Sequence, residues 1–316
     1  MTTLTRREFG ATAAAALAGG ACSQSGRRVI GVIPKATSHL FFVSIHAGVK
    51  RAANEFRIDV LWNGPSDETD HNRQIQILDS MVAQRVSAIA ISATDERALT
   101  GPVQRAIQTG IPVTLFDSGV ETQDYVTFVS TDNKGAGELA AERLAALVSG
   151  KGKVAMVMQK PGGNSTGFRE TAFEATIGAR FPGIALAARQ YCMADRARAL
   201  AAAENILTAH PDVAGIFCSS EAASLGTIQA LRSRGAAGKV RLVTFDTSEL
   251  HVEALGDGTI DLMLVQDSVE IGYQAVASLA RKLRGDRTAK LLPLPAREIV
   301  KASLGDPAVM KLLRPA

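Results

Sequence analysis

The 316-residue sequence contains few of the residues from which metal clusters and disulfide scaffolds are built. It has 3 cysteines and 5 histidines, with no CxxC or HxxxH spacing, which excludes a zinc-cluster domain and a disulfide-dense fold. It has no GxSxG motif and no histidine paired with a plausible nucleophile. With 46% apolar residues, a chain of this length buries a large core without such cross-links. We therefore expect no enzyme, no cofactor and no metal.

Nucleotide-binding motifs are also absent. Gly135-Ala136-Gly137 lacks the third glycine of a dinucleotide-binding turn, and Gly150-Lys151-Gly152-Lys153 lacks the Ser or Thr that follows the lysine of a phosphate loop. The net charge is +4, but the basic residues are scattered and form no focused stripe. We therefore expect no nucleic-acid partner.

Long apolar runs are missing as well, and the N-terminal one is too short to cross a membrane. Arg6-Arg7 and Phe9 precede a mostly apolar run of eight residues, 11–18, whereas a membrane-spanning helix needs about 20. A charged start, a short apolar middle and a small-residue end are typical of an export signal. The paired arginines resemble a twin-arginine signal, so we expect export to the periplasm or cell envelope.

Cys22 lies within this leader, which we place at residues 1–26. The cysteine stands where a bacterial lipoprotein is cut and lipidated, although Gly19 replaces the aliphatic residue usual three positions before such a cysteine. Cleavage after Ala16-Leu17-Ala18 is the alternative, and it would release a soluble protein. Of the two, lipidation at Cys22 is the favoured expectation.

From Arg28 onward, short apolar runs alternate with segments of helical period. Ten strands are predicted, at Val29–Ile33, Val60–Trp62, Ala88–Ser92, Pro112–Phe116, Val126–Ser130, Lys153–Met158, Ile184–Tyr191, Gly215–Ser219, Arg241–Phe245 and Leu262–Gln266. Continuous apolar strands separated by helices favour parallel sheets covered on both faces. Because ten strands are many for one sheet, we predict an α/β fold of two doubly wound parallel-sheet lobes.

Both halves of the chain contain a strand that ends in Phe-Asp, at Phe116-Asp117 and Phe245-Asp246. Ligands of doubly wound sheets bind beyond the carboxyl ends of the strands. Two such sheets facing each other would therefore place both aspartates on one cleft between the lobes. We predict an N-terminal lobe of residues 27–131 plus 267–295 and a C-terminal lobe of residues 132–266 plus 296–316. The three hinge segments would lie near Ser130, Gln266 and Pro295.

Several stretches resemble the periplasmic sugar-binding proteins of the ribose-binding family, in order along nearly the whole chain after Arg28. They are Phe41-Phe42-Val43-Ser44, Phe116-Asp117, Ser130-Thr131-Asp132-Asn133, 205–213, Ser224-Leu225-Gly226, Phe245-Asp246 and Gln266. The resemblance implies a solute-binding component of an ABC importer, with two lobes, three hinge crossings and a sugar between the lobes. The implied partners are a sugar and a membrane permease, and we expect a monomer.

The resemblance also implies ligand contacts at matching positions. These are the aromatic residues Phe41, Phe42 and Phe245, the carboxylates Asp117 and Asp246, the guanidinium of Arg169 and the amide of Gln266. The chain departs from the ribose binders at Lys35, His39, Ser118, Ala194 and Ser220. We expect Lys35, His39 and Ser220 to face the cleft, which would be roomier near Ala194 and more basic near Lys35 than in ribose binders.

A sugar has apolar C–H faces and a polar rim, so aromatic rings, acceptor carboxylates and a guanidinium suit it. Each residue also has an alternative role. Phe42 lies on the core stripe of its helix, whereas Phe41 is about 100° around from it. The two aspartates could instead cap the helices that follow them. Arg169 could instead lie on a solvated helix face.

Lys35 and His39 are open to more interpretations than the other candidates. Each is either solvated or in the cleft. Within the cleft, Lys35 either pairs with Asp117 or selects an acidic or phosphorylated sugar. Selectivity would come from Asp117, Asp246 and Arg169, because an analogue lacking a hydroxyl leaves a buried charged group unpaired.

Cys192 and Cys218 belong to strands that should flank the first strand of the second lobe. Two strand spacings separate them by about 9.6 Å, beyond the roughly 7 Å limit between the Cα atoms of a disulfide. We therefore predict two free thiols.

Two other functions share this architecture. One is a sensor that presents its sugar to a membrane receptor, which the sequence does not distinguish from transport. The other is a transcription regulator related to the lactose repressor, which would need an N-terminal helix-turn-helix. An export signal occupies that end of the chain, and the first core strand begins at Val29.

Overall fold

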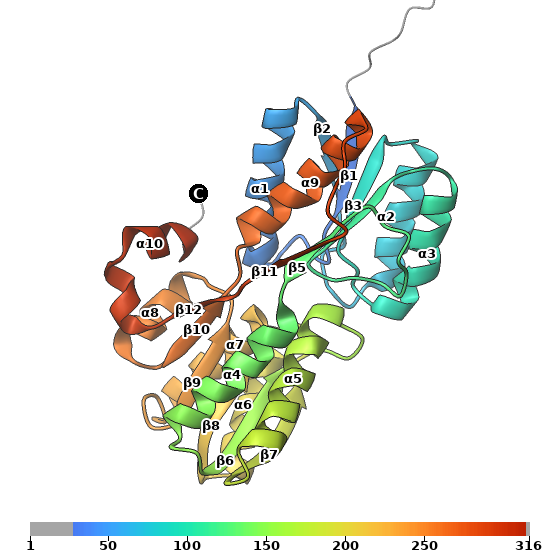
Figure 1. The fold of residues 1–316 in the computed structure, drawn as a ribbon. Helices are drawn as coiled ribbons and strands as arrows, with labels where there is room; N and C mark the ends of the chain where they lie inside the picture. Colours follow the sequence, from blue (N-terminus) through green and yellow to red (C-terminus); the bar gives the residue numbers. More distant parts are fainter. Residues whose placement is uncertain (1–27, 314–316) are drawn as a thin grey trace, which may run out of the picture.

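The computed structural model describes residues 28–313, which fold into two lobes joined by three chain crossings (Figure 1). The export signal and the lipidation site at Cys22 lie outside the described residues. Within residues 28–313, every helix is too short or too polar to span a membrane. The α/β fold of two parallel-sheet lobes predicted from the sequence is confirmed.

The N-terminal lobe has one six-stranded sheet in the order β11-β5-β4-β3-β1-β2, with every pair parallel. Its strands are β1 (Val29–Ile33), β2 (Asp59–Trp62), β3 (Ala88–Ile91), β4 (Val113–Phe116), β5 (Phe128–Thr131) and β11 (Leu291–Leu294). Its helices are α1 (Leu40–Phe56), α2 (His71–Ala83), α3 (Glu96–Gln108) and α9 (Ser268–Arg284).

The C-terminal lobe has the sheet order β12-β10-β9-β8-β6-β7. Its strands are β6 (Gly152–Met158), β7 (Ile184–Tyr191), β8 (Val213–Cys218), β9 (Arg241–Phe245), β10 (Leu262–Val265) and β12 (Arg297–Ile299). Its helices are α4 (Asn133–Leu147), α5 (Asn164–Arg180), α6 (Arg196–Ala209), α7 (Glu221–Ser233), α8 (Glu249–Asp257), the 3-10 helix η1 (Lys301–Gly305) and α10 (Pro307–Leu313). Edge strand β12 pairs antiparallel with β10, which departs from the all-parallel expectation.

Each sheet is covered by helices on both faces, which explains why its central strands are mostly apolar. In β1, Ile30 and Val32 pack toward α1 and α9, while Ile33 packs toward α2 and α3. Successive side chains of a strand point to opposite faces, so burial on both faces needs apolar residues at every position.

The chain crosses between the lobes at 131–133, 265–268 and 294–297. The sequence prediction missed strands β11 and β12, which lie on either side of the third crossing. It also missed helices α4 and α9. Ser38 is a candidate cap for helix α1 from the sequence, but the helix begins at Leu40, one residue later than that cap requires. Its N-cap is His39, which makes no side-chain capping bond, and Ser38 Oγ donates to Ser66 O at 2.9 Å instead.

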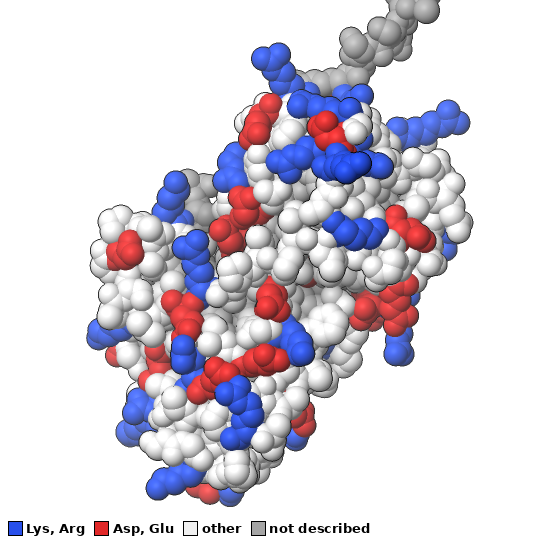
Figure 2. Space-filling view, viewed as in Figure 1, with Lys and Arg blue, Asp and Glu red and all other residues white. Residues whose placement is uncertain are grey.

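Figure 2 shows acidic and basic side chains interspersed over both lobes. On the face drawn there, no basic stripe runs from one lobe to the other.

Candidate functional site

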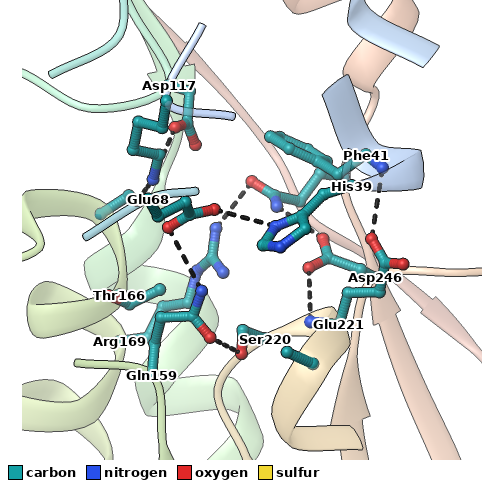
Figure 3. A pocket seen from close by; sticks show the side chains of 14 residues that line it. His39, Phe41, Glu68, Asp117, Gln159, Thr166, Arg169, Ser220, Glu221 and Asp246 are labelled. Atoms are coloured by element: carbon teal, nitrogen blue, oxygen red, sulfur yellow. Dashed lines mark hydrogen bonds and ion pairs between the residues drawn. The ribbon is translucent and has the colours of Figure 1, made fainter. Parts of the chain in front are cut away.

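A pocket lies between the lobes, where the carboxyl ends of both sets of parallel strands face each other. About 340 Å³ of space among its side chains is free of protein atoms, counting the part that opens to solvent. Its lining consists of Lys35, His39, Phe41, Glu68, Asp117, Gln159, Ser165, Thr166, Arg169, Ser220, Glu221, Ala222, Asp246 and Gln266 (Figure 3).

Asp117 and Asp246 occupy equivalent places in the two lobes. Each follows a fully buried phenylalanine at the end of a strand, and each has a left-handed backbone, with φ of 56° and 70°. Neither caps the helix that follows it in sequence: α8 is capped by Ser248, and Asp117 is followed by β5. Non-glycine residues with positive φ are uncommon and concentrate at functional sites.

Lys35 is buried and paired with Asp117, with 2.9 Å between Nζ and Oδ2. Its ammonium also donates to Ser118 Oγ at 3.1 Å and, across the cleft, to Ser165 Oγ at 3.4 Å. Burial opposes the charge of Lys35, but Asp117 and Glu68 outweigh it and raise the pKa of the lysine. The solvated alternative for Lys35 is therefore wrong, and the pairing with Asp117 is the alternative that the structure adopts.

Glu68, which sequence analysis did not single out, lies in the loop between β2 and α2. Its Oε1 is 3.2 Å from His39 Nδ1, and its Oε2 accepts from Gln159 Nε2 of the other lobe at 3.2 Å. Burial alone would raise the pKa of Glu68, but Lys35, His39 and Gln159 lower it to about 2. The hydrogen bond and charge of Glu68 in turn raise the pKa of His39 against the opposing effect of burial.

Arg169 extends from α5 into the centre of the site. Its guanidinium lies over the ring of Phe245, 3.8 Å from the ring centroid, and donates to Asn133 Oδ1, Ser219 O and Gln266 Oε1 at 2.7, 3.0 and 2.7 Å. Such a fixed, stacked guanidinium offers its remaining N–H groups in one direction. The solvated alternative for Arg169 is wrong, because the side chain is 2% exposed.

Glu221, at the first position of α7, is the second acidic residue that sequence analysis did not single out. Its Oε2 accepts from the backbone N–H of Phe41 in the opposite lobe at 3.2 Å. Its backbone N–H donates to Asp246 Oδ2 at 3.0 Å, and Asp246 Oδ1 accepts from Gln266 Nε2 at 2.6 Å. Burial, followed by the charge of Asp246, raises the pKa of Glu221 to about 7. Burial likewise raises the pKa of Asp246.

Gln159 and Ser220 connect the pocket to the ends of β6 and β8. Ser220 is the N-cap of α7, and its hydroxyl donates to Gln159 Oε1. Gln159 thus links Glu68 of one lobe to Ser220 of the other. Gln159 directly follows the predicted strand Lys153–Met158, and Glu221 directly follows the candidate residue Ser220. Their positions beyond the strand ends were the signal that could have identified both residues from the sequence.

Eight of the ten candidate ligand residues line the pocket, and Phe42 and Phe245 do not. Phe42 is 1% exposed and packs in the core between α1, α9 and the sheet, edge-on to Phe41. Phe245 is fully buried beneath Arg169. The helical position of Phe42 on the apolar stripe of α1 explains its core location, while Phe41 faces the pocket. Ser118 and Ala194 do not line the pocket either.

A family model described as the periplasmic binding protein domain matches residues 30–287. The chain belongs to this family. Among its relatives, the ribose import binding protein of Bacillus subtilis is 26% identical over 278 residues, which cover 87% of this chain and 89% of that protein. The resemblance identified from the sequence is confirmed.

Solved structures of ABC transporter solute-binding proteins have the same fold. One from Agrobacterium vitis, bound to α-D-tagatopyranose, has a TM-score of 0.88 at 29% identity, covering 92% of this chain and 100% of its own. Another from Agrobacterium radiobacter, in complex with D-arabinose, has a TM-score of 0.89 at 28% identity with the same coverage.

Proposed function

We propose that this protein captures a monosaccharide or sugar alcohol between its lobes and delivers it to the permease of an ABC importer. The observation that supports this most directly is the convergence of carboxylates, amides and a stacked guanidinium from both lobes on one pocket. These groups match the donors and acceptors of a sugar rim. Relatives named for ribose, and solved neighbours that hold monosaccharides, point to the same ligand class.

Binding would couple to closure because the pocket belongs to both lobes. Several contacts already bridge them, and those in the pocket include Lys35 to Ser165, Gln159 to Glu68, and the Phe41 N–H to Glu221. A ligand held by both halves favours the closed arrangement of a hinged protein. The permease would then recognise the closed surface, and no covalent bond of the sugar would change.

Isothermal titration of the protein with neutral pentoses, hexoses and alditols tests this function. We expect one of them to bind at a 1:1 ratio, and Asp246→Asn to weaken it about 10- to 100-fold, since a hydrogen bond to a charged group contributes about 1.5–3 kcal/mol. Asp79→Asn is the matched control, because Asp79 is exposed on α2 and outside the pocket. Conversion of a bound sugar to product, or no sugar binding at all, would contradict the proposal.

We further propose that the protein reaches the cell envelope through the twin-arginine route, remains anchored by a lipid on Cys22, and acts as a monomer. Replacing Arg6 and Arg7 by lysine should leave the protein in the cytoplasm. Cys22→Ser should move it from the membrane fraction to the soluble fraction. Retention of Cys22→Ser in the membrane fraction would exclude the anchor.

A further inference from the structure

Carboxylates outnumber cations in the pocket. Glu68, Asp117, Glu221 and Asp246 line it, against the two permanent cations Lys35 and Arg169 (Figure 3). His39 adds one positive charge only when it is protonated. The lining is therefore negative by one or two charges when its carboxylates are ionised.

Both permanent cations are already bound within the protein. Lys35 is 5% exposed and held by Asp117, Ser118 and Ser165. Arg169 is 2% exposed, and each of its three nitrogens donates to a protein acceptor. A carboxylate or phosphate on a sugar would meet no cation except the remaining N–H groups of Arg169 and would face several carboxylates. The geometry therefore disfavours acidic and phosphorylated sugars.

Glu221 is the pocket carboxylate with the least compensation. Asp117 forms an ion pair with Lys35, and Glu68 forms one with His39 when the histidine is protonated. Asp246 has the guanidinium of Arg169 as a nearby opposite charge. Within residues 28–313, Glu221 forms no ion pair, and its Oε2 accepts only the Phe41 N–H across the cleft. The opposite charge near it is that of His39, which already pairs with Glu68. Burial and the charge of Asp246 favour the protonated form of Glu221, and a ligand that brings a cation would favour its ionised form.

We propose that the sugar recognised by this pocket carries an amino group and that its ammonium binds Glu221, beside Asp246. This rests on the proposed function, because it names a subclass of the sugars that the pocket would bind. An ammonium presents three donors and no acceptor, which suits two neighbouring carboxylates better than a hydroxyl does. Hydrogen bonds between ionised partners are roughly twice as strong as neutral ones. An N-acetyl group would lose the charge and add bulk.

The test compares sugars that differ at one carbon. Glucosamine, galactosamine and mannosamine are each titrated at neutral pH beside the parent hexose and the N-acetyl derivative, together with 1-amino-1-deoxyalditols beside their alditols. We expect at least one amine to bind ten times more tightly than its hydroxyl parent and its N-acetyl form. A parent that binds as well as its amine would overturn this inference and leave the proposed function standing. If no carbohydrate of either kind binds, both fail.

Glu221→Gln locates the ammonium. The amide keeps an oxygen that accepts from the Phe41 N–H, but it carries no charge. We therefore expect the affinity for the amino sugar to fall at least tenfold, while the affinity for the hydroxyl parent changes little. Glu249→Gln is the matched control, because Glu249 also lies in the first turn of its helix but is exposed and outside the pocket. An amine preference that survives in Glu221→Gln would overturn the assignment to Glu221.

Discussion

Lys35 and Asp117 form a buried ion pair, with 2.9 Å between Nζ and Oδ2 and less than a tenth of either side chain exposed. The pair lies at the carboxyl ends of β1 and β4, on the N-terminal side of the cleft. Lys35 therefore serves as the counter-ion of a carboxylate that lines the pocket. A ligand anion would have to compete with Asp117 for this ammonium.

Removing one member of this pair should be more damaging than removing both. We expect Lys35→Met to destabilise the protein by about 3–5 kcal/mol, because it leaves Asp117 buried without its cation. Lys35→Met combined with Asp117→Asn should recover most of that loss. Urea unfolding followed by circular dichroism measures both variants.

Lys153→Met is the control for this prediction, because Lys153 pairs with Asp212 at 2.9 Å on the surface. Exposed pairs contribute about 0–1 kcal/mol. Equal losses in Lys35→Met and Lys153→Met would contradict the buried character of the first pair.

Glu170 should make stability depend on pH. It is 4% exposed behind the site, and its Oε1 accepts from the Gln159 N–H and the Ser219 hydroxyl. Burial raises its pKa from 4.5 to about 7. The folded protein therefore holds this proton more tightly than the unfolded chain does. The resulting stability is complete below pH 4.5 and is lost as the pH rises to 7.

Glu170→Gln keeps the acceptor oxygen and removes the titration. At about 1.4 kcal/mol per pKa unit, the stability of the variant relative to wild type should rise by about 3 kcal/mol between pH 4.5 and pH 8. Unfolding by urea across this range measures the difference. A difference that stays constant with pH would show that Glu170 titrates normally in the folded protein.

Helices α1 and α9 are in backbone contact at two glycines. A Cβ on Gly48 would lie 1.9 Å from Val269 O, and one on Gly272 would lie 2.0 Å from Ile45 O. We expect Gly48→Ala to destabilise the protein by about 1–3 kcal/mol, the usual effect of overpacking. In Gly178→Ala, on the exposed face of α5, the new methyl group meets nothing within 4 Å. It should stabilise by up to about 1 kcal/mol, and thermal unfolding compares the two.

The prediction of free thiols at Cys192 and Cys218 is confirmed, since β7 and β8 flank β6 and both cysteines are unpaired. Burial raises the pKa of each thiol to about 12. An alkylating reagent should therefore leave both unmodified in the native protein. It should modify both after denaturation without a reductant, as read from the masses of their peptides. Modification of the native protein would show that these strands open readily.

The strand and helix order followed from the sequence wherever burial on both sheet faces left a continuous apolar run, as at Val29–Ile33. The sequence prediction failed where buried and exposed positions differ little in hydrophobicity. Edge strand β11 is half exposed and contains Pro293, which only an edge strand tolerates. The buried face of α4 is mostly alanine and glycine, such as Ala136, Gly137 and Ala140, so its helical period is faint.

The repeated Phe-Asp strand ends were enough, by themselves, to place Asp117 and Asp246 on one cleft, because parallel strands direct their carboxyl ends to the same edge. Only the tertiary structure brought Glu68 and Glu221 into that cleft. It also decided that Lys35 neutralises Asp117, which sequence analysis had left open. Sequence spacing does not encode which charges meet across two lobes. Which charged groups pair depends on distance and burial, because a desolvated ammonium needs a nearby carboxylate to offset the cost of losing water.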